Sequence, residues 1–182
     1  EGATGVLVLA DGSVIWGLGI GAHGATVGEI CFNTSITGYQ EILTDPSYAG
    51  QIINFTFPHV GNVGTNLEDN ESTTPAARGL ILRAEITRPS NWRAIKNLDA
   101  WLKSRNLIGV AGVDTRSLTR RIRDCGAPIG VICNAMKNDP PDIDADFTGK
   151  FTLNALLNSA RKWPGLEGMD LAKEVTCNQP YN

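Results

Sequence analysis

The stretch that decides the fold spans residues 32–66 and has the sequence FNTSITGYQEILTDPSYAGQIINFTFPHVGNVGTN. It contains hydroxyl, amide and imidazole side chains, whereas the segments on either side have the apolar composition of a hydrophobic core. Thr37 and Gln40 have the spacing of a capping box, in which two side chains satisfy the free amides at the start of a helix. This pattern predicts a short helix over residues 38–43, and any functional site of the chain is expected in this region.

The tetrapeptide DPSY at residues 45–48 predicts a tight turn directly after that helix. Asp at the first position and Pro at the second favour a type I turn. Such a turn places the Ser47 hydroxyl at the tip of a loop. Two roles are open for this hydroxyl, which can contact a ligand or satisfy the backbone of its own turn.

Length and charge indicate one domain, or one domain and a tail, and exclude several function classes. A chain of 182 residues can fill one core but is short for two domains. The formal net charge of -3 and the pI near 5.4 argue against a nucleic-acid surface, because phosphate binding needs a positive excess. No apolar run is long enough to cross a bilayer, and the first residues lack a signal-peptide pattern. We therefore expect a cytoplasmic protein without membrane contact.

The cysteines give no sign of a metal site or a catalytic thiol. They form no C-x-x-C pair and have no histidine at ligand spacing, so no metal is expected. None lies in the sharp glycine turn that presents a nucleophilic cysteine. The four positions are Cys31, Cys125, Cys133 and Cys177.

The remaining patterns predict an α/β domain. Apolar runs predict a hairpin and then single strands, at residues 5–9 with 13–17, 51–57, 79–84, 107–113 and 129–133. A period near 3.6 predicts helices at residues 91–106, 115–125 and 152–163. A loop rich in proline and aspartate is expected at residues 137–146.

The predicted helices have apolar faces that we expect to be buried. In the first helix the apolar residues are Ile95, Leu98, Trp101 and Leu102, and in the second they are Leu118, Ile122 and Cys125. The opposite face of the second helix carries Arg116, Arg120 and Arg123. These arginines are typical of a solvated face, but they also suit docking of an acidic partner.

Two further features invite a functional interpretation. Gly19, Gly21 and Gly24 spell G-x-G-x-x-G after a strand, as in a dinucleotide-binding turn, but that motif needs a helix at the third glycine. The residues that follow have a strand pattern, so a bend between strands is expected. His59 has no carboxylate or second histidine at a sequence spacing typical of a catalytic or metal site. This favours a histidine that hydrogen-bonds within its loop over a catalytic base or metal ligand.

Several blocks of the sequence resemble the N-terminal domain of the small, glutaminase-bearing subunit of glutamine-dependent carbamoyl-phosphate synthase. They follow one another in the family's order and cover nearly the whole chain. The blocks are LVLADGSVIWG, VGEICFNTSITGYQEILTDPSYAGQI, FPHVGNVGTN, DAWLKSRNLIGVAGVDTRSLTRRIRD and PGLEGMDLAKEV.

The resemblance implies a swivelling β/β/α domain, with a parallel central sheet, an antiparallel layer and helices outside. It implies that residues 1–150 form this domain and that residues 151–182 form a helix and the start of a linker to an amidotransferase domain. In the family that second domain hydrolyses glutamine with a Cys-His-Glu triad. Ammonia then passes to the large subunit, which uses ATP and Mg to make carbamoyl phosphate from bicarbonate. This chain alone is expected to be inactive, with no catalytic residue and no cofactor of its own.

The resemblance also implies roles for individual residues. Ser47 occupies the position of a family serine that contacts the bound glutamine. Docking to the large subunit is expected from the loop that carries His59 and Asn62, or from the three arginines Arg116, Arg120 and Arg123. Two other classes stay open: a stand-alone interaction module without catalysis, and a nucleotide-binding oxidoreductase that depends on the glycine motif alone.

Overall fold

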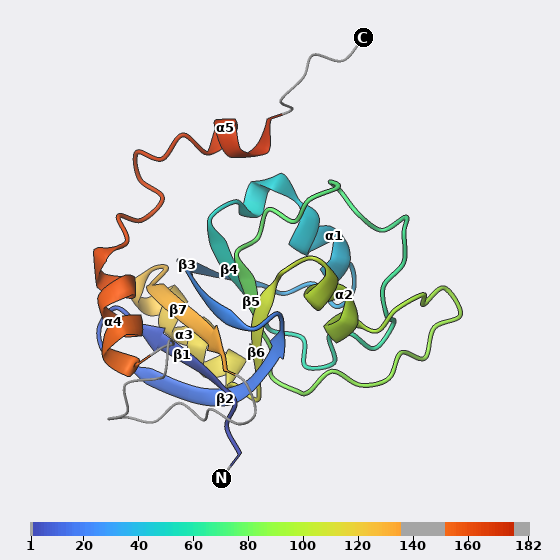
Figure 1. Cartoon of the computed structure of the whole chain (residues 1–182), viewed down its shortest axis with the longest axis horizontal. Helices are drawn as coiled ribbons and strands as arrows, with labels where there is room; N and C mark the ends of the chain where they lie inside the picture. The colour runs from blue at the N-terminus through green and yellow to red at the C-terminus, as the bar shows by residue number, and fades with distance from the viewer. Residues whose placement is uncertain (1, 136–151, 177–182) are drawn as a thin grey trace.

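The computed structural model describes residues 2–135 and 152–176, in which seven strands close into one barrel (Figure 1). The strand order around the barrel is β1-β2-β6-β5-β4-β3-β7. The strands are β1 (Gly5–Leu9), β2 (Val14–Gly21), β3 (Gly24–Asn33), β4 (Gln51–Phe55), β5 (Gly79–Ile81), β6 (Ile108–Ala111) and β7 (Ile129–Asn134). Each strand that the sequence predicted is present, and the α/β class is confirmed.

Parallel and antiparallel strands belong to the same sheet. Neighbours from β3 through β4 and β5 to β6 are parallel, and the pairs that involve β1, β2 and β7 are antiparallel. The family resemblance implied a parallel central sheet and a second, antiparallel layer. In the structure β2 pairs with β6 and β7 pairs with β3, which joins the parallel and antiparallel strands into one closed sheet. Closure leaves the sheet without a free edge.

The helices pack on the outer surface of the barrel or cover one of its ends. They are α1 (Tyr39–Thr44), η1 (Pro46–Tyr48, a 3₁₀ turn), α2 (Leu98–Ser104), α3 (Thr115–Cys125), α4 (Leu153–Lys162) and α5 (Leu171–Val175). In Figure 1, α4 lies on one side of the barrel and α1 and α2 lie on the other. No helix in the described residues is long and apolar enough to span a membrane.

Alternation along the strands sends side chains to the inside or the outside of the barrel. Leu7 of β1 and Ile132 of β7 belong to the interior cluster, and Val6 of β1 belongs to an outer cluster with α4. Leu118 and Ile122 join the interior cluster, so α3 covers one end of the barrel. Residues of α1 and α2 form the third cluster, with Ile53, Phe55, Leu80 and Ala111 on the outer face of the parallel strands.

Helix α3 confirms its predicted start and stop, with one correction on its inner face. Asp114 is the N-cap, and its carboxylate accepts a hydrogen bond from the Ser117 amide at 3.1 Å, while Gly126 ends the helix. Cys125 was expected to face inward but is exposed. It is the last residue of the helix, next to Gly126, whose φ of +86° turns the chain out of the helix.

The helix predicted over residues 91–106 is shorter than expected. It starts at Leu98, because the Asn97 side chain caps it by accepting a hydrogen bond from the Ala100 amide at 2.7 Å. The chain before it forms a backbone bridge between Thr65 and Lys96. Ile95, expected on the buried face of the helix, is therefore exposed.

The glycine motif makes a bend between strands, as predicted. β2 ends at Gly21 and β3 begins at Gly24, with no helix at the third glycine. The Asn134 amide donates hydrogen bonds to the carbonyl oxygens of residues 20–22, at 3.1, 3.3 and 3.0 Å. A Cβ atom on Gly19 would lie 1.9 Å from the Asn134 Oδ1 atom. The glycine at residue 19 is thus explained by packing against Asn134.

Three expectations fall outside the described residues. They are the loop at residues 137–146, the role of Cys177 and the domain boundary at residue 150. The boundary stays a prediction.

Candidate functional site

Ser47 lies on an exposed, well-formed turn. The Asp45 carboxylate accepts a hydrogen bond from the Ser47 amide at 2.8 Å, and the Tyr48 amide donates to the Asp45 carbonyl at 3.1 Å. Pro46 fixes the first position of the 3₁₀ turn. The predicted tight turn is confirmed. The Ser47 hydroxyl makes no hydrogen bond to any residue that the structure describes, so within that part of the chain it remains available to a ligand.

Contacts on both sides fix the position of this turn. The Tyr48 hydroxyl accepts a hydrogen bond from the Asn33 side-chain amide at 3.0 Å, which ties the turn to the end of β3. After the turn, Gly50 has a φ of +77° and is buried against Leu166, since a Cβ atom there would lie 2.5 Å from the Leu166 Cδ2 atom. The segment that leads to α5 therefore packs beside the serine turn.

The start of α1 differs from the predicted capping box. Its N-cap is Gly38, with a φ of +80° and a ψ of +22°, and no side chain caps the helix. Thr37 is exposed, and Gln40 is only 3% exposed. The expected reciprocal pair does not form because the Gln40 amide has partners elsewhere, in the loop after β4.

The Gln40 amide binds the loop that follows β4. Its Nε2 atom donates to the Asn66 carbonyl oxygen at 2.7 Å and to the Asn70 Oδ1 atom at 2.9 Å. Its Oε1 atom accepts from the Asn66 amide at 3.0 Å. The side chain thus pairs with both backbone groups of Asn66 as a neighbouring strand would. These contacts hold α1 against a segment 26 residues away in the sequence.

Tyr39 provides a second contact between α1 and the same loop. Its hydroxyl donates a hydrogen bond to the Gly64 carbonyl oxygen. Burial is the main reason that the pKa of the Tyr39 phenol lies well above its ordinary value. The phenol therefore stays a neutral donor over the physiological pH range. The loop can approach this closely because Gly61 and Gly64 have φ values of +99° and +72°, which favour glycine.

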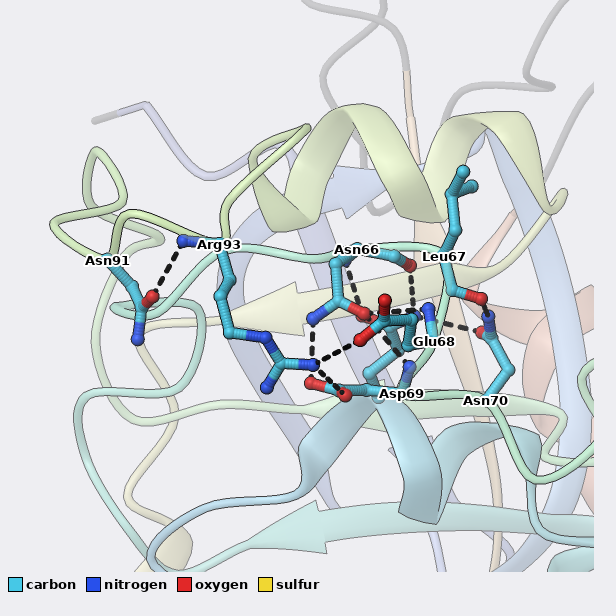
Figure 2. Close-up of polar contacts among 8 residues, drawn as sticks. Asn66, Leu67, Glu68, Asp69, Asn70, Asn91 and Arg93 are labelled. Carbon is cyan, nitrogen blue, oxygen red and sulfur yellow. Dashed lines mark hydrogen bonds and ion pairs between the residues drawn. The ribbon is translucent and has the colours of Figure 1, made fainter.

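A polar cluster extends from this loop to the segment before α2 (Figure 2). The Arg93 guanidinium lies 2.9 Å from the Asp69 carboxylate and 3.0 Å from the Glu68 carboxylate. Asn66 donates from its side chain to Asp69 at 2.7 Å. A pocket of about 280 Å³ lies between this cluster and the start of α1. The sequence patterns did not predict a role for these residues. Their only signal was the density of amide and carboxylate side chains after β4.

His59 and Asn62 occupy the same loop as Gly61 but make different contacts. His59 is exposed, and its ring packs edge-on against Phe57 with 5.9 Å between the centroids. Asn62 is half-buried, and its backbone carbonyl accepts a hydrogen bond from the Ser90 amide at 3.0 Å. Neither side chain makes a hydrogen bond within the described residues.

The structure does not bring the three arginines together with Ser47. Arg116, Arg120 and Arg123 are all exposed on α3, and none forms an ion pair within the described residues. Ser47 lies on η1, next to α1. The arginines and the serine are thus two separate surface features.

The thiols that the structure describes are poor nucleophiles or lie outside any site. Burial raises the pKa of both Cys31 and Cys133 to about 11, so neither forms a thiolate near neutral pH. Cys125 is exposed at the end of α3. No group of three metal-binding side chains occurs among the described residues.

Fold and site together define an α/β barrel domain that presents a serine on an anchored turn beside a loop held by amide contacts. The family model for "Carbamoyl-phosphate synthase small chain, CPSase domain" matches residues 7–132, more than half of the chain. The chain therefore belongs to the carbamoyl-phosphate synthase small chain family.

Curated relatives agree with this family. The carbamoyl phosphate synthase small chain of Bradyrhizobium diazoefficiens is 58% identical over 98% of this chain. That of Rhizobium meliloti is 57% identical over 98%, and that of Caulobacter vibrioides is 54% identical over 99%. The chain covers 43%, 43% and 45% of these relatives, so it spans less than half of their length.

Proposed function

We propose that the chain acts as the N-terminal scaffold and interface domain of the small subunit of glutamine-dependent carbamoyl-phosphate synthase. In this proposal the rest of the subunit hydrolyses glutamine. The large subunit then uses the ammonia, with ATP and Mg, to make carbamoyl phosphate from bicarbonate in the cytoplasm. Family membership and the partial coverage of the relatives support this division. The present chain supplies no catalytic residue and is expected to be inactive alone.

We further propose that Ser47 binds the substrate glutamine. The observation that carries this role is its exposed hydroxyl, which has no hydrogen-bond partner among the described residues, on a turn fixed by Asp45 on one side and by the Tyr48 contact with Asn33 on the other. A hydroxyl there can donate to the α-carboxylate or accept from the α-amino group of glutamine. It would orient the substrate without taking part in bond cleavage.

The path of the chain after α4 supports this role for Ser47. Gly50 packs against Leu166, and Leu171 of α5 lies next to the same glycine, with its Cδ2 atom 3.8 Å from a Cβ atom placed on Gly50. The chain therefore leads past the serine turn. A domain that follows in the longer subunit would start on the side of the barrel where the Ser47 hydroxyl is exposed.

Docking to the large subunit is a second part of the proposal. The candidates are the exposed ring of His59, the amide of Asn62, and the three arginines on the exposed face of α3. Three guanidinium groups without an ion pair in the described residues would suit carboxylates on a partner. The swivelling β/β/α family fold and the boundary at residue 150 belong to the same proposal.

The proposal is tested by the Ser47→Ala substitution in the complete small subunit, assembled with the large subunit. Loss of one hydrogen bond to a charged group costs about 1.5–3 kcal/mol, which corresponds to a rise of roughly 10- to 100-fold in KM for glutamine. The value of kcat should change less, because the contact orients the bound substrate. Synthesis from free ammonia should not change.

Ser117→Ala is the matched control, because Ser117 is also exposed but lies on α3. It should leave the kinetics of glutamine unchanged. A fall in kcat with an unchanged KM for Ser47→Ala would assign Ser47 a role in the chemistry. Glutamine hydrolysis by the isolated chain, if it persists after removal of every cysteine, would contradict the division of labour.

A further inference from the structure

Two loops that contain no helix or strand are held together as one surface. We call residues 62–70 and 90–97 the paired loops. The Thr65 amide donates to the Lys96 carbonyl at 2.9 Å, and the Ile95 amide donates to the Thr65 carbonyl at 2.9 Å. Arg93 pairs with carboxylates of the other loop, as Figure 2 shows. The paired loops are therefore held together by backbone bonds at Thr65 and by the ion pairs of Arg93.

This ordered surface exposes large apolar side chains. Of the eight large hydrophobic residues that are exposed in the described part of the chain, four lie on the paired loops. They are Trp92, Leu67, Ile95 and Val63, at 91%, 80%, 62% and 36% exposure. Single exposed apolar residues are common on soluble proteins, but a concentration on two fixed loops marks an interaction surface.

The surface also has a small recess next to these side chains. Leu67 and Ile95 border a pocket of about 80 Å³ whose lining includes Trp101 and Arg105. The Arg105 guanidinium lies 5.8 Å from the centroid of the Trp101 ring. The pocket can receive one aliphatic side chain, while Trp92 projects outward as a complementary anchor. Anchors of this kind carry most of the energy of a protein interface.

The amount of apolar surface fits a protein interface. A tryptophan side chain offers on the order of 150–250 Å² of area, so the exposed residues together offer roughly half of the ~800 Å² that each partner contributes to a standard interface. Charges of both signs surround the patch, from Lys96 and Arg105 to Glu68 and Asp69. A mixed rim suits a protein partner better than an anionic membrane, which selects for basic residues.

The course of the chain argues against coverage by a domain that follows α5. The segment before α5 packs at Gly50, on the serine-turn side, and Figure 1 shows α5 and the loop before α2 at different sides of the molecule. We propose that the paired loops dock onto an apolar patch of the large subunit, with Trp92, the most exposed of these side chains, as an anchor. This inference rests on the proposed function, because it assumes that a large subunit is the partner.

The test compares binding of complete small-subunit variants to the purified large subunit by titration calorimetry. Trp92→Ser should raise Kd at least about thirtyfold, the effect of removing a hot-spot residue. Val63→Ser should raise Kd severalfold, and Val14→Ser is its matched control, because Val14 on β2 has 37% exposure and should bind normally. Urea unfolding of each variant checks that the fold is intact.

The outcomes separate this inference from the proposed function. If wild-type small subunit does not bind the large subunit, the proposed function fails, and this inference with it. If the wild type binds and Trp92→Ser binds within about threefold of it, only the docking surface is wrong. The inference is also overturned if Trp92→Ser dissociates a self-associated small subunit, or changes only KM for glutamine, while Kd for the large subunit stays the same.

Discussion

Replacement of Gln40 by methionine should detach α1 from the loop after β4. Gln40 is almost fully buried, and its amide makes three hydrogen bonds, two of them to the backbone of Asn66. Methionine has a similar length and volume, so the Gln40→Met variant keeps the packing of the site and removes only the polar contacts. The Asn66 amide and carbonyl then lose their partners in a half-buried position.

The expected loss of stability follows from those bonds. A buried hydrogen bond contributes about 0.5–1.5 kcal/mol, so three of them amount to roughly 3 kcal/mol. Domains are stable by only about 5–15 kcal/mol, so this loss is a large part of the total. With a urea m-value of about 2 kcal/mol per molar, the unfolding midpoint should fall by roughly 1.5 M. The capping box predicted from the sequence gives Gln40 one hydrogen bond, to the cap amide, and its loss would cost only about 0.5–1.5 kcal/mol.

The assay is urea unfolding followed by circular dichroism, together with hydrogen exchange of the loop. Gln51→Met is the matched control, since Gln51 makes one long contact of 3.5 Å, to Glu29. Its midpoint should stay close to that of the wild type. Exchange of the Asn66 amide should accelerate in Gln40→Met only. A Gln40→Met midpoint within about 0.3 M of the wild type would refute the assignment of these three bonds as stabilising.

Two further predictions concern the barrel. Gly19→Ala should destabilise the fold by about 1–3 kcal/mol in urea unfolding, because the new Cβ atom would meet Asn134. Asn134→Ala in the same chain should recover part of that loss. The packing explanation would be contradicted if the loss in the double variant equalled the sum of the losses in the two single variants. Burial raises the pKa of Cys133, and of Cys31, from 9.0 to about 11, so the native state holds these protons more tightly than the unfolded chain. Their contribution to stability is complete below about pH 9 and is lost as the pH rises toward 11. The urea midpoint of the wild type should fall between about pH 8 and about pH 10.5, and this fall should be smaller in Cys133→Ala but unchanged in the control Cys125→Ala. An unchanged fall in Cys133→Ala would show that burial does not raise the pKa of the Cys133 thiol.

Local patterns predicted the barrel strands and two of the longer helices. The hairpin of β1 and β2 follows from two apolar runs around a glycine turn, and α3 follows from Asp114 before a period near 3.6. Within α3, and between β1 and β2, the backbone partners are close in the sequence, although β1 also pairs with β7 and β2 with β6. The apolar period also fixes which face is buried, and the burial of Leu118 and Ile122 agrees with it.

Two of the errors occur where a side chain or a backbone group has a distant partner. Thr37 and Gln40 have the spacing of a capping box, yet Gln40 binds Asn66, and a glycine begins α1 instead. Ile95 fits a helical stripe, yet the backbone around it pairs with Thr65. In both cases tertiary hydrogen bonds override a local preference worth about 1 kcal/mol, and no spacing rule reports on a partner 26 or more residues away.

The same distant contacts explain how a site can be built from irregular chain. Segments 56–78 and 82–97 contain no helix or strand, although the structure describes both, so their polar backbone groups need partners from elsewhere. Tyr39 and Gln40 supply some of these partners from one end of α1, and the other end of α1 leads into the Ser47 turn. A six-residue helix is too short to be stable alone. Helix α1 therefore persists because Tyr39 and Gln40 bond to the loop. These contacts support the Ser47 turn from the side of α1, and the Tyr48 contact with Asn33 supports it from the side of β3.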